Sequence, residues 1–271
     1  MNRLELTIVP IGGLANRMRI IMSILYLSAS SQDSIPICIV WRSNKECRAW
    51  FEELFLPIKQ DNIVFSHGSY ADEVSSRNNL WLPTLLRIGR YTIWKDDISP
   101  SVFPVEKFLE REGKVHLSTC HALCDYNQES VKEIFRPRQN IMGKVESFTE
   151  NFSAHTLGVH IRRTDNKQSI MHSPLSEFEK RIDTYMEEFA DAKIFLCSDE
   201  KRVKDFFRQR YGDRLLTRQA VLSRNSLEGM QDAVADLWCL SRTQTVIGSY
   251  YSSFSDTATE IGGQPLEIIK I

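Results

Sequence analysis

The stretch TLGVHIRRTD (residues 156–165) decides how the fold is interpreted, because an apolar run passes directly into a polar turn with two arginines. Thr156–Ile161 has the length and the apolar character of a buried strand. Ser173 and Pro174 then mark the start of a helix, with serine as the cap and proline at the first helical position. A strand that leads into a helix predicts an α/β fold built on a parallel sheet.

The residues after this helix continue the alternation of strands and helices. Apolar periodicity predicts helices over Glu200–Tyr211, Glu228–Arg242 and Ser255–Ile261. Short apolar runs predict strands over Lys193–Ser198, Thr245–Gly248 and Leu266–Ile271. Together these elements predict one Rossmann-like domain at residues 151–271.

The residues before this domain show a second series of the same kind. Strands are predicted over Thr7–Ile11, Ile35–Trp41, Asn62–Ser66 and Lys114–Thr119. A helical pattern follows Gly12, whereas His67–Pro104 is mixed, aromatic and interpreted as irregular with some helix. Since the two series are joined around Phe135–Phe152, we expect two facing Rossmann-like domains with mostly parallel sheets, one over 1–150 and one over 151–271.

The bulk properties exclude several classes of protein. The 271 residues carry a formal net charge of -1, so the whole chain has no attraction to nucleic acid or to an anionic membrane. Cys120 and Cys124 have no second cysteine pair nearby, which argues against a metal site. The start of the chain lacks the long uncharged core of a signal peptide, and no apolar run approaches the ~20 residues of a membrane span. The expected compartment is the cytoplasm.

Ligands of parallel α/β sheets bind outside the carboxyl ends of the strands. The first loop at such a position is GGLANR (residues 12–17), which joins a strand to a helix. Its glycines let the backbone approach a ligand, and the helix N-terminus after them favours an anion. The alternative is a plain tight turn, because neither a dinucleotide-binding nor a P-loop pattern is present.

The second loop contains Arg162 and Arg163. Adjacent residues of a strand point to opposite faces, so one arginine can face a ligand while the other pairs with a carboxylate. The planar guanidinium matches the oxygens of a phosphate. The alternative is a surface pair of arginines in salt bridges.

Two further loops follow predicted strands. GSYYSSFS (residues 248–255) is rich in serine and leads into a helix, where Ser252 and Ser253 could bind an anion or cap the helix. Asp199 follows Lys193–Ser198, where its carboxylate could accept hydrogen bonds from a ribose or cap the next helix. The cap is the favoured interpretation for Asp199.

These motifs, taken in order, resemble those of the fucosyltransferase superfamily, which includes bacterial, plant-type, nodulation and core fucosyltransferases. The resemblance rests on GGLANR (12–17), HIRRTD (160–165), Ser198 with Asp199, and Asp236 followed by GS (248–249) and SSFS (252–255). It implies a GT-B fold and a metal-free site in the C-terminal domain for GDP-fucose. The implied reaction transfers fucose to a hydroxyl group of a glycan acceptor with inversion at the anomeric carbon.

The resemblance also implies roles for individual residues. Arg162 would clamp the diphosphate, with Arg163 as support for the loop. Asp199, His160 and Asp236 would contact the nucleoside, and Ser252 and Ser253 would donate hydrogen bonds to phosphate. From the N-terminal side, the residues expected to face the ligand are Gly13, Asn16 and Arg17.

The chain departs from the core fucosyltransferases directly after this box. They carry a lysine after the aspartate and a glutamate a few residues later, whereas this chain has Asn166 and then Lys167, with no acidic residue before His172. The expected base for the acceptor hydroxyl is therefore Asp165 or His160, although Asp165 could instead anchor Arg163.

Two other functions agree with the same residues: a transferase that uses another nucleotide sugar, and a protein that binds a nucleotide or glycan without catalysis. The acceptor would be recognised by the first domain, where Trp81, Tyr91 and Trp94 could stack on sugar rings or pack in the core. A lipid-linked acceptor would bring the enzyme to the inner membrane surface, yet the sequence has no basic amphipathic helix to bind there.

Overall fold

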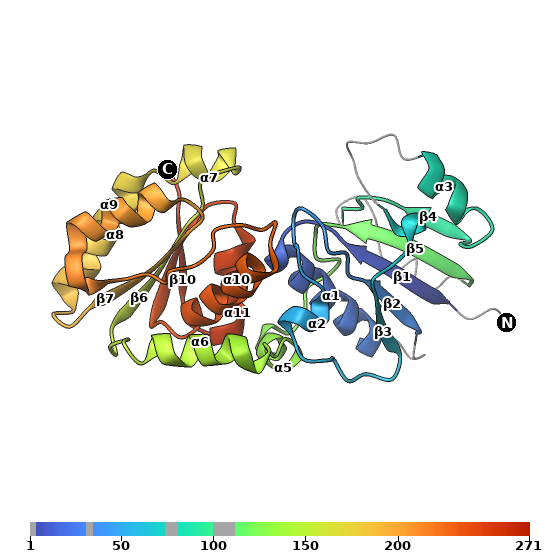
Figure 1. Cartoon of the computed structure of the whole chain (residues 1–271), viewed down its shortest axis with the longest axis horizontal. Coiled ribbons are helices and arrows are strands. Elements are labelled where there is room, and N and C mark those ends of the chain that lie inside the picture. The colour runs from blue at the N-terminus through green and yellow to red at the C-terminus, as the bar shows by residue number, and fades with distance from the viewer. Residues whose placement is uncertain (1–3, 31–34, 74–80, 100–111) are drawn as a thin grey trace. The chain divides into compact units, whose positions relative to one another are not determined.

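A computed structural model of the chain describes residues 4–30, 35–73, 81–99 and 112–271, with only the backbone at 81–83. The described residues form two compact units, Met1–Asn127 and Gln128–Ile271 (Figure 1). The boundary lies 23 residues before the predicted division at 150/151. The reason is that the helical segments after the boundary pack on helices of the second unit: η2 (Gln128–Ser130) and α5 (Val131–Ile134) on α11 (Ser253–Gly262), and α6 (Gln139–Thr149) on α10 (Leu227–Leu240).

The N-terminal unit is built on a five-stranded parallel sheet of order β3-β2-β1-β5-β4. Its strands are β1 (Glu5–Pro10), β2 (Ile37–Val40), β3 (Ile63–Ser66), β4 (Ile93–Lys95) and β5 (Lys114–Thr119). Its helical segments are α1 (Leu14–Ser30), α2 (Phe51–Leu54), η1 (Tyr70–Asp72) and α3 (Trp81–Arg87). Four of the five strands confirm the sequence prediction. The short β4 lies in the segment interpreted as irregular, because three residues are too few to show an alternating pattern.

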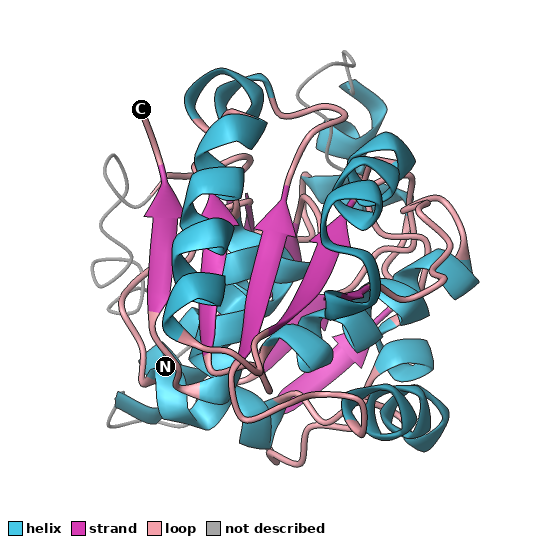
Figure 2. Ribbon diagram, turned by 90° about the vertical axis from the view of Figure 1, so that its left-hand side faces the viewer, coloured by secondary structure: helices cyan, strands magenta, loops and turns pink. Residues whose placement is uncertain are grey.

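The C-terminal unit has a second five-stranded parallel sheet, of order β10-β9-β6-β7-β8 (Figure 2). Its strands are β6 (Thr156–Ile161), β7 (Lys193–Ser198), β8 (Leu215–Leu216), β9 (Thr245–Ser249) and β10 (Leu266–Ile269). Its helical segments besides α6 and α10 are η2 (Gln128–Ser130), α5 (Val131–Ile134), α7 (Lys167–His172), α8 (Leu175–Glu188), α9 (Lys201–Tyr211), η3 (Gly212–Arg214) and α11 (Ser253–Gly262). The predicted mostly parallel α/β architecture with two sheets is therefore confirmed.

The central strand β6 shows how this unit is layered. Its alternate residues Leu157, Val159 and Ile161 are buried in the core that includes side chains of α8 and α9. The residues between them face α10 and α11 on the other side of the sheet. A Cβ atom at Gly158 would lie 2.5 Å from the hydroxyl of Thr243, so only glycine allows the backbone to approach there. Because both faces of the sheet are covered by helices, its functional groups must come from the strand ends.

The order of the strands locates the functional edge of each sheet. In the C-terminal unit the chain leaves β6 through β7 and β8, and then crosses back to β9 on the other side of β6. In the N-terminal unit the corresponding reversal lies between β1 and β5. Such a reversal opens a crevice at the carboxyl ends of the strands, where ligands of parallel α/β sheets bind.

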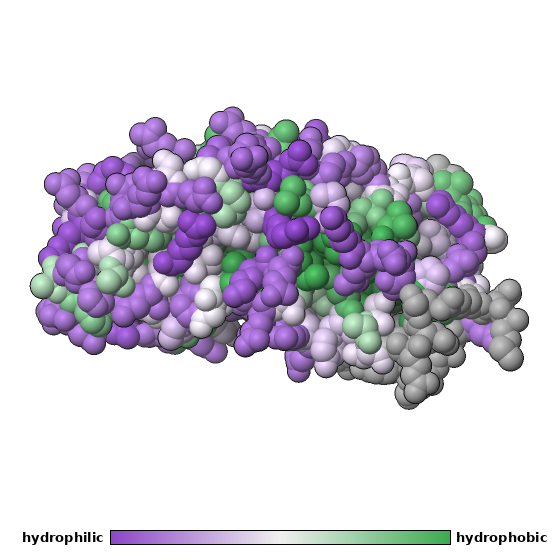
Figure 3. Space-filling model, turned by 90° about the horizontal axis from the view of Figure 1, so that it is seen from below, coloured by the Kyte–Doolittle hydropathy of each residue, from purple (hydrophilic) through white to green (hydrophobic). Residues whose placement is uncertain are grey.

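One face of the C-terminal unit carries few grouped apolar side chains. On the face shown in Figure 3, hydrophilic residues dominate this unit, and the apolar ones are scattered in small groups. Within the described ranges, none of the helices combines the length and the apolar character needed to span a bilayer.

Candidate functional site

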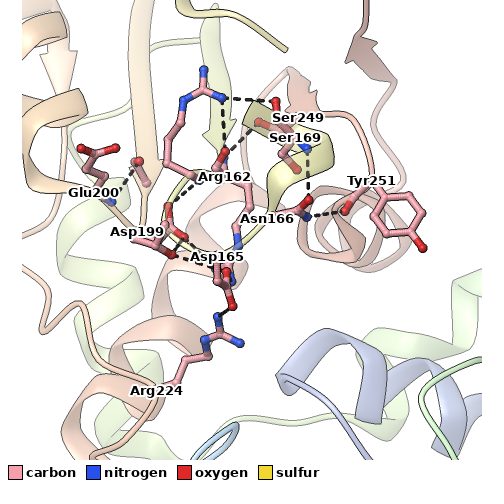
Figure 4. A network of polar contacts seen from close by, with 12 residues as sticks. Arg162, Asp165, Asn166, Ser169, Asp199, Glu200, Arg224, Ser249 and Tyr251 are labelled. Atoms are coloured by element: carbon pink, nitrogen blue, oxygen red, sulfur yellow. Dashed lines mark hydrogen bonds and ion pairs between the residues drawn. The ribbon is translucent and has the colours of Figure 1, made fainter. Parts of the chain in front are cut away.

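The carboxyl ends of β6 and β9 meet at the reversal of the C-terminal sheet. The backbone N–H of Arg162, which follows β6, donates to the hydroxyl of Ser249 at the end of β9 (3.0 Å). Figure 4 shows the polar groups that surround this point, which come from the carboxyl ends of β6, β7 and β9 and the turns after them, from α7, and from the loop before α10. Segments far apart in the sequence thus supply one cluster of charged side chains.

Arg163 supports the loop from inside the protein. It is buried, with 7% of its surface exposed, and its guanidinium donates to the carbonyl oxygens of Ser173 (2.6 Å) and Ser169 (3.3 Å). The sequence suggested that one arginine faces a ligand while the other pairs with a carboxylate, and it left open that Asp165 anchors Arg163. In the structure the carboxylates pair with Arg162, whereas the Arg163 guanidinium contacts carbonyl oxygens, so Asp165 does not anchor Arg163.

The Arg162 side chain lies at the edge of the sheet between two carboxylates. Its guanidinium pairs with Asp199 at 2.9 Å and with Asp165, and 21% of the side chain is exposed. An arginine with exposed acidic partners can exchange them for a ligand, because such ion pairs contribute little free energy. This position suits the diphosphate clamp that the sequence predicts, and the assignment remains a prediction.

Asp199 orders the turn that carries Arg162. Its two oxygens accept hydrogen bonds from the backbone N–H of Arg163 (2.8 Å) and the hydroxyl of Thr164 (2.6 Å). The interpretation of Asp199 as a helix cap is wrong, because the N-cap position of α9 is Glu200. The predicted contact of Asp199 with the ribose or base would require the carboxylate to serve both the loop and the ligand.

Asp165 lies between two arginines. One carboxylate oxygen pairs with Arg162 and the other with Arg224, which lies in the loop between β8 and α10. Partial burial acts to raise the pKa of Asp165, but Arg162 and Arg224 outweigh it and lower the pKa below its ordinary value. A carboxylate with a lowered pKa is a weaker proton acceptor, so this arrangement favours an ionic role over that of the predicted base.

His160 is the buried polar residue beneath the loop. Its ring packs on Phe254 of α11, with ring centres 4.8 Å apart, and its Nδ1 atom has no hydrogen-bond partner in the described part of the chain. Burial and the charge of Arg162 lower the pKa of His160 to about 4, so the ring is neutral at pH 7. An unpartnered nitrogen inside a protein is rare, which makes His160 a reasonable ligand contact but a poor base for an exposed hydroxyl.

The turn from β9 into α11 is strained at Tyr251. This residue adopts φ +59°, in the left-handed region that non-glycine residues seldom occupy. The Asn166 side chain donates to the Tyr251 carbonyl oxygen (2.8 Å) and caps α7 by accepting from Ser169. Asn166, which departs from the core fucosyltransferases, therefore fixes the turn between β9 and α11. Because β9 pairs with β6, the N-terminus of α11 lies near the end of β6, where Arg162 follows.

Ser252 occupies the N-cap position of α11 without making a side-chain cap bond. Ser253 is the first residue of that helix. Their expected role as phosphate donors is not tested by these contacts, but the position at a helix N-terminus favours an anion. At the other helix start, Ser173 was expected to cap α8; its hydroxyl instead donates to Ile269 (2.7 Å), and Pro174 is the N-cap residue.

Asp236 lies inside the unit on α10. It is 8% exposed and pairs with Arg218 at 2.7 Å, while Arg218 also contacts Asp232 at 3.1 Å. Burial raises the pKa of Asp236, and the charge of Arg218 opposes that effect. The predicted contact with guanine N–H groups stays a prediction, and it would compete with this ion pair.

The glycine loop of the N-terminal unit is held by its own arginine. Arg17 is fully buried, and its guanidinium donates to the carbonyl oxygens of Gly12 (2.8 Å) and Arg42 (2.5 Å) and to the side chain of Asn44 (3.0 Å). Burial lowers the pKa of Arg17, although the neighbouring Cys47 and Glu46 act in the opposite direction. Arg17 was expected to face the ligand, but in this structure its guanidinium donors are used within the protein, where they stabilise the loop at residues 12–17.

The other residues of this loop have different surroundings. Gly12 has φ +87°, which favours glycine, and a Cβ atom there would lie 3.0 Å from Nδ2 of the half-buried Asn16. A Cβ atom at Gly13 would meet no atom within 4 Å, so packing within the described chain does not explain this glycine. The predicted approach of a ligand to Gly13 and Asn16 agrees with that space and remains to be tested.

The aromatic residues predicted to stack on sugars are only partly described. The Trp81 side chain lies outside the described residues, and Trp94 is half-buried on β4. Tyr91 packs on the buried ring of His116, with ring centres 4.9 Å apart, which favours the structural interpretation for that residue.

No sequence pattern singled out Arg224. It lies in the segment SRNS (residues 223–226), where the recognisable signal is Ser226, the N-cap of α10. Sequence reasoning missed Arg224 because its partner Asp165 is 59 positions away. Among the described residues, no cluster of His, Cys, Asp and Glu could hold a metal ion, and the six cysteines form no disulfide bonds with one another.

The structure is similar to solved structures of fucosyltransferases. NodZ alpha-1,6-fucosyltransferase soaked with GDP-fucose matches with a TM-score of 0.64 and 18% sequence identity, over 96% of this chain and 93% of that chain. POFUT1 in complex with GDP matches with a TM-score of 0.59 and 12% identity, over 100% and 99% of the two chains. A mutant of Arabidopsis thaliana FUT1 in complex with GDP matches with a TM-score of 0.61 and 12% identity, over 97% and 69%.

No family model matches the sequence, and a comparison with curated proteins also gives no match. The likeness is therefore one of structure. The two parallel five-stranded sheets have the GT-B fold of these fucosyltransferases, which confirms the predicted resemblance at the level of the fold.

Proposed function

We propose that this protein is a glycosyltransferase that moves fucose from GDP-fucose to a hydroxyl group of a glycan by metal-independent inverting displacement. The observation that carries the proposal is the position of Arg162. It follows the central strand at the reversal of the C-terminal sheet, adjoins the strand that leads into α11, and is paired with two carboxylates, of which the exposed Asp165 can be displaced. The similar structures named above, which contain GDP or GDP-fucose, support the choice of donor.

The transfer reaction defines a role for Arg162 and for the start of α11. The acceptor oxygen bonds to the anomeric carbon of fucose as the bond from that carbon to the diphosphate breaks, so negative charge develops on the departing GDP. Arg162, together with the N–H groups and hydroxyls at the start of α11, would stabilise that charge. Because a guanidinium and a helix N-terminus supply the positive charge, the reaction does not need a divalent cation.

Two buried residues of the C-terminal unit would contact the nucleoside part of the donor. Neutral His160, whose Nδ1 has no partner in the described ranges, would contact the nucleoside from below the loop, and Asp236 would bind the base if Arg218 releases it. The acceptor proton must pass to a base. Asp165, whose side chain is 56% exposed, can reach an acceptor, whereas His160 is buried, so Asp165 is the better candidate within this unit once its arginines bind phosphate.

The experiment that tests the donor is a thermal-shift screen of GDP, GDP-fucose, UDP and UDP-sugars. We expect GDP and GDP-fucose to raise the melting temperature, because ligands that bind only the folded state stabilise it. Stabilisation by UDP-sugars alone would contradict GDP-fucose as the donor and favour a transferase that uses another nucleotide sugar. A glycan-acceptor array with GDP-fucose, run with and without EDTA, then tests transfer and the need for a metal.

One observation favours a second function, binding without transfer. Both carboxylates next to Arg162 are ion-paired, so neither is a free base in the structure. A protein of this kind would bind GDP-fucose but would release no GDP with any acceptor. Detection of fucosylated product on the array would eliminate this alternative.

A further inference from the structure

Arg224 reaches the strand-end cluster from a distant part of the chain. It lies in the loop between β8 and α10, and its guanidinium donates to one oxygen of Asp165, while Arg162 donates to the other. Figure 4 shows Asp165 between the two arginines. Two guanidinium groups thus converge on one carboxylate, each taking one oxygen.

The carboxylate between them is held only loosely. Its side chain is 56% exposed, and besides the two arginines it accepts a long hydrogen bond from the Thr164 hydroxyl at 3.5 Å. Asp199 differs, because it also accepts from the backbone N–H of Arg163 and so belongs to the loop. Exposed ion pairs contribute little, so an anion with more charge can take the place of Asp165.

The charges of the cluster lead to the same conclusion. Arg162 and Arg224 carry two positive charges, and Asp165 and Asp199 carry two negative charges, so the cluster is neutral as it stands. A diphosphate that entered without displacing a carboxylate would meet no net positive charge. Once Asp165 turns away, both arginines face the ligand, and their planar forks match phosphate oxygens.

We propose that Arg224 is a second arginine of the diphosphate site, which leaves Asp165 and binds the diphosphate of the donor opposite Arg162. Asp165 occupies the anion position between the two arginines in the free protein and competes with the ligand for them. This inference rests on the proposed function, because it assumes that the anion is a nucleoside diphosphate.

The first test measures the affinity for GDP by calorimetry in the wild type and in Arg224→Ala. The variant should bind GDP about tenfold more weakly, because one charge-assisted contact is lost. Arg224→Lys should recover part of the loss, since it restores the charge but not the fork. The matched control is Arg181→Ala, which removes an arginine of similar exposure (41% against 39%) that is paired with Glu267, and it should bind GDP like the wild type.

The second test removes the competing carboxylate. Asp165→Asn should bind GDP about threefold or more tightly, because both arginines then lack their acidic partner. In the Arg224→Ala background the same change should gain less, because only Arg162 remains to be released. Equal GDP affinity of wild type and Arg224→Ala would overturn the inference, as would a gain from Asp165→Asn that does not depend on Arg224.

Inorganic pyrophosphate separates failure of this inference from failure of the proposed function. If the wild type binds GDP and Arg224→Ala binds it equally well, the inference fails and the proposed function stands. If the wild type binds pyrophosphate in an Arg224-dependent manner but does not bind GDP or GDP-fucose, the proposed function fails and the anion site stands. If the wild type binds none of the three compounds, both fail.

Discussion

The loops that follow β1 and β6 hold their arginines in opposite ways, although each loop lies at the end of the strand where its sheet reverses. In the N-terminal unit, Arg17 is fully buried and donates to two carbonyl oxygens and one amide oxygen. In the C-terminal unit, Arg162 is partly exposed and pairs with two carboxylates, both of them reachable by water. Arg163, its neighbour in sequence, repeats the arrangement of Arg17.

The difference shows that the acceptor decides what an arginine at a strand end can do. Carbonyl oxygens inside a protein lose their hydrogen bonds if the arginine moves, which costs free energy at each of them. Exposed carboxylates are rehydrated when the arginine leaves, so they can be exchanged for a ligand at little cost. Arg17 and Arg163 are accordingly expected to determine stability, and Arg162 to determine activity.

Arg17→Ala should have the largest effect on stability. The change leaves two partly buried carbonyl oxygens without the guanidinium, takes one of three donors from the Asn44 amide oxygen, and removes the contact of the buried Arg17 with the Trp41 ring. The free energy of unfolding should therefore fall by about 3 to 5 kcal/mol. Urea denaturation of the wild type and the variant measures this change in the free energy of unfolding. The control is the exposed Arg48→Ala, which should stay within about 0.5 kcal/mol of the wild type. A stable, inactive Arg17→Ala would show instead that Arg17 binds substrate.

Arg162→Ala should lower the rate of fucose transfer on the order of a hundredfold or more, with little change in melting temperature. The reason is that the charge on the departing diphosphate loses its fixed partner. Arg163→Ala should show the reverse, a lower melting temperature before any specific effect on transfer, because its acceptors are buried carbonyl oxygens. Full activity of Arg162→Ala in the array assay would remove the clamp from the proposed mechanism.

His160 makes the C-terminal loop sensitive to acid. Its pKa is about 4 in the folded protein and 6.5 in the unfolded chain, so the unfolded state binds more protons between these values. Stability is therefore lost as the pH falls through this window, by about 2 kcal/mol between pH 7 and pH 5. His160→Gln should remove this part of the pH dependence in urea titrations at both pH values. An unchanged slope would mean that His160 is not held neutral by burial.

The smallest expected effects on the free energy of unfolding concern the two residues with left-handed backbone conformation, Gly12 and Tyr251. Gly12 has φ +87° and Tyr251 has φ +59°, so only the second turn carries the strain of a side chain. Tyr251→Gly should raise the free energy of unfolding by at most about 1 kcal/mol, since the relief of strain exceeds the entropy cost of glycine only slightly. Gly12→Ala should lower it by about 1 to 2 kcal/mol. A marked loss in Tyr251→Gly would show that the exposed ring contributes contacts.

Much of the fold was open to prediction because apolar periodicity is local. The strands from Thr7, Thr156 and Lys193 and the long helices were found within a few residues, since each strand is an apolar run and each helix shows helical spacing of its apolar residues. The two-residue β8 and the three-residue β4 were not found, because elements of that length contain no pattern.

The candidate site was open to prediction only in part. The rule that ligands bind at strand ends identified the loops that carry Arg162, Asp199 and Ser252. The sequence could not show which of the two arginines is buried. Burial depends on whether the guanidinium contacts the carbonyl oxygens of α7, as in Arg163, or the carboxylate after β7, as in Arg162. Arg224 could not be identified for the same reason, because its partner Asp165 lies in the turn after β6, 59 positions away.

The sequence by itself determined the parallel sheets, the position of the polar loops and the resemblance to fucosyltransferases, since these follow from patterns within short stretches of chain. Only the tertiary structure decided that Arg163 is internal, that Arg162 and Arg224 share Asp165, and that the Nδ1 atom of His160 has no hydrogen-bond partner among the residues that the structure describes. The physical reason is that hydrogen bonding and burial depend on atoms from distant segments, whereas propensity and periodicity depend on neighbours.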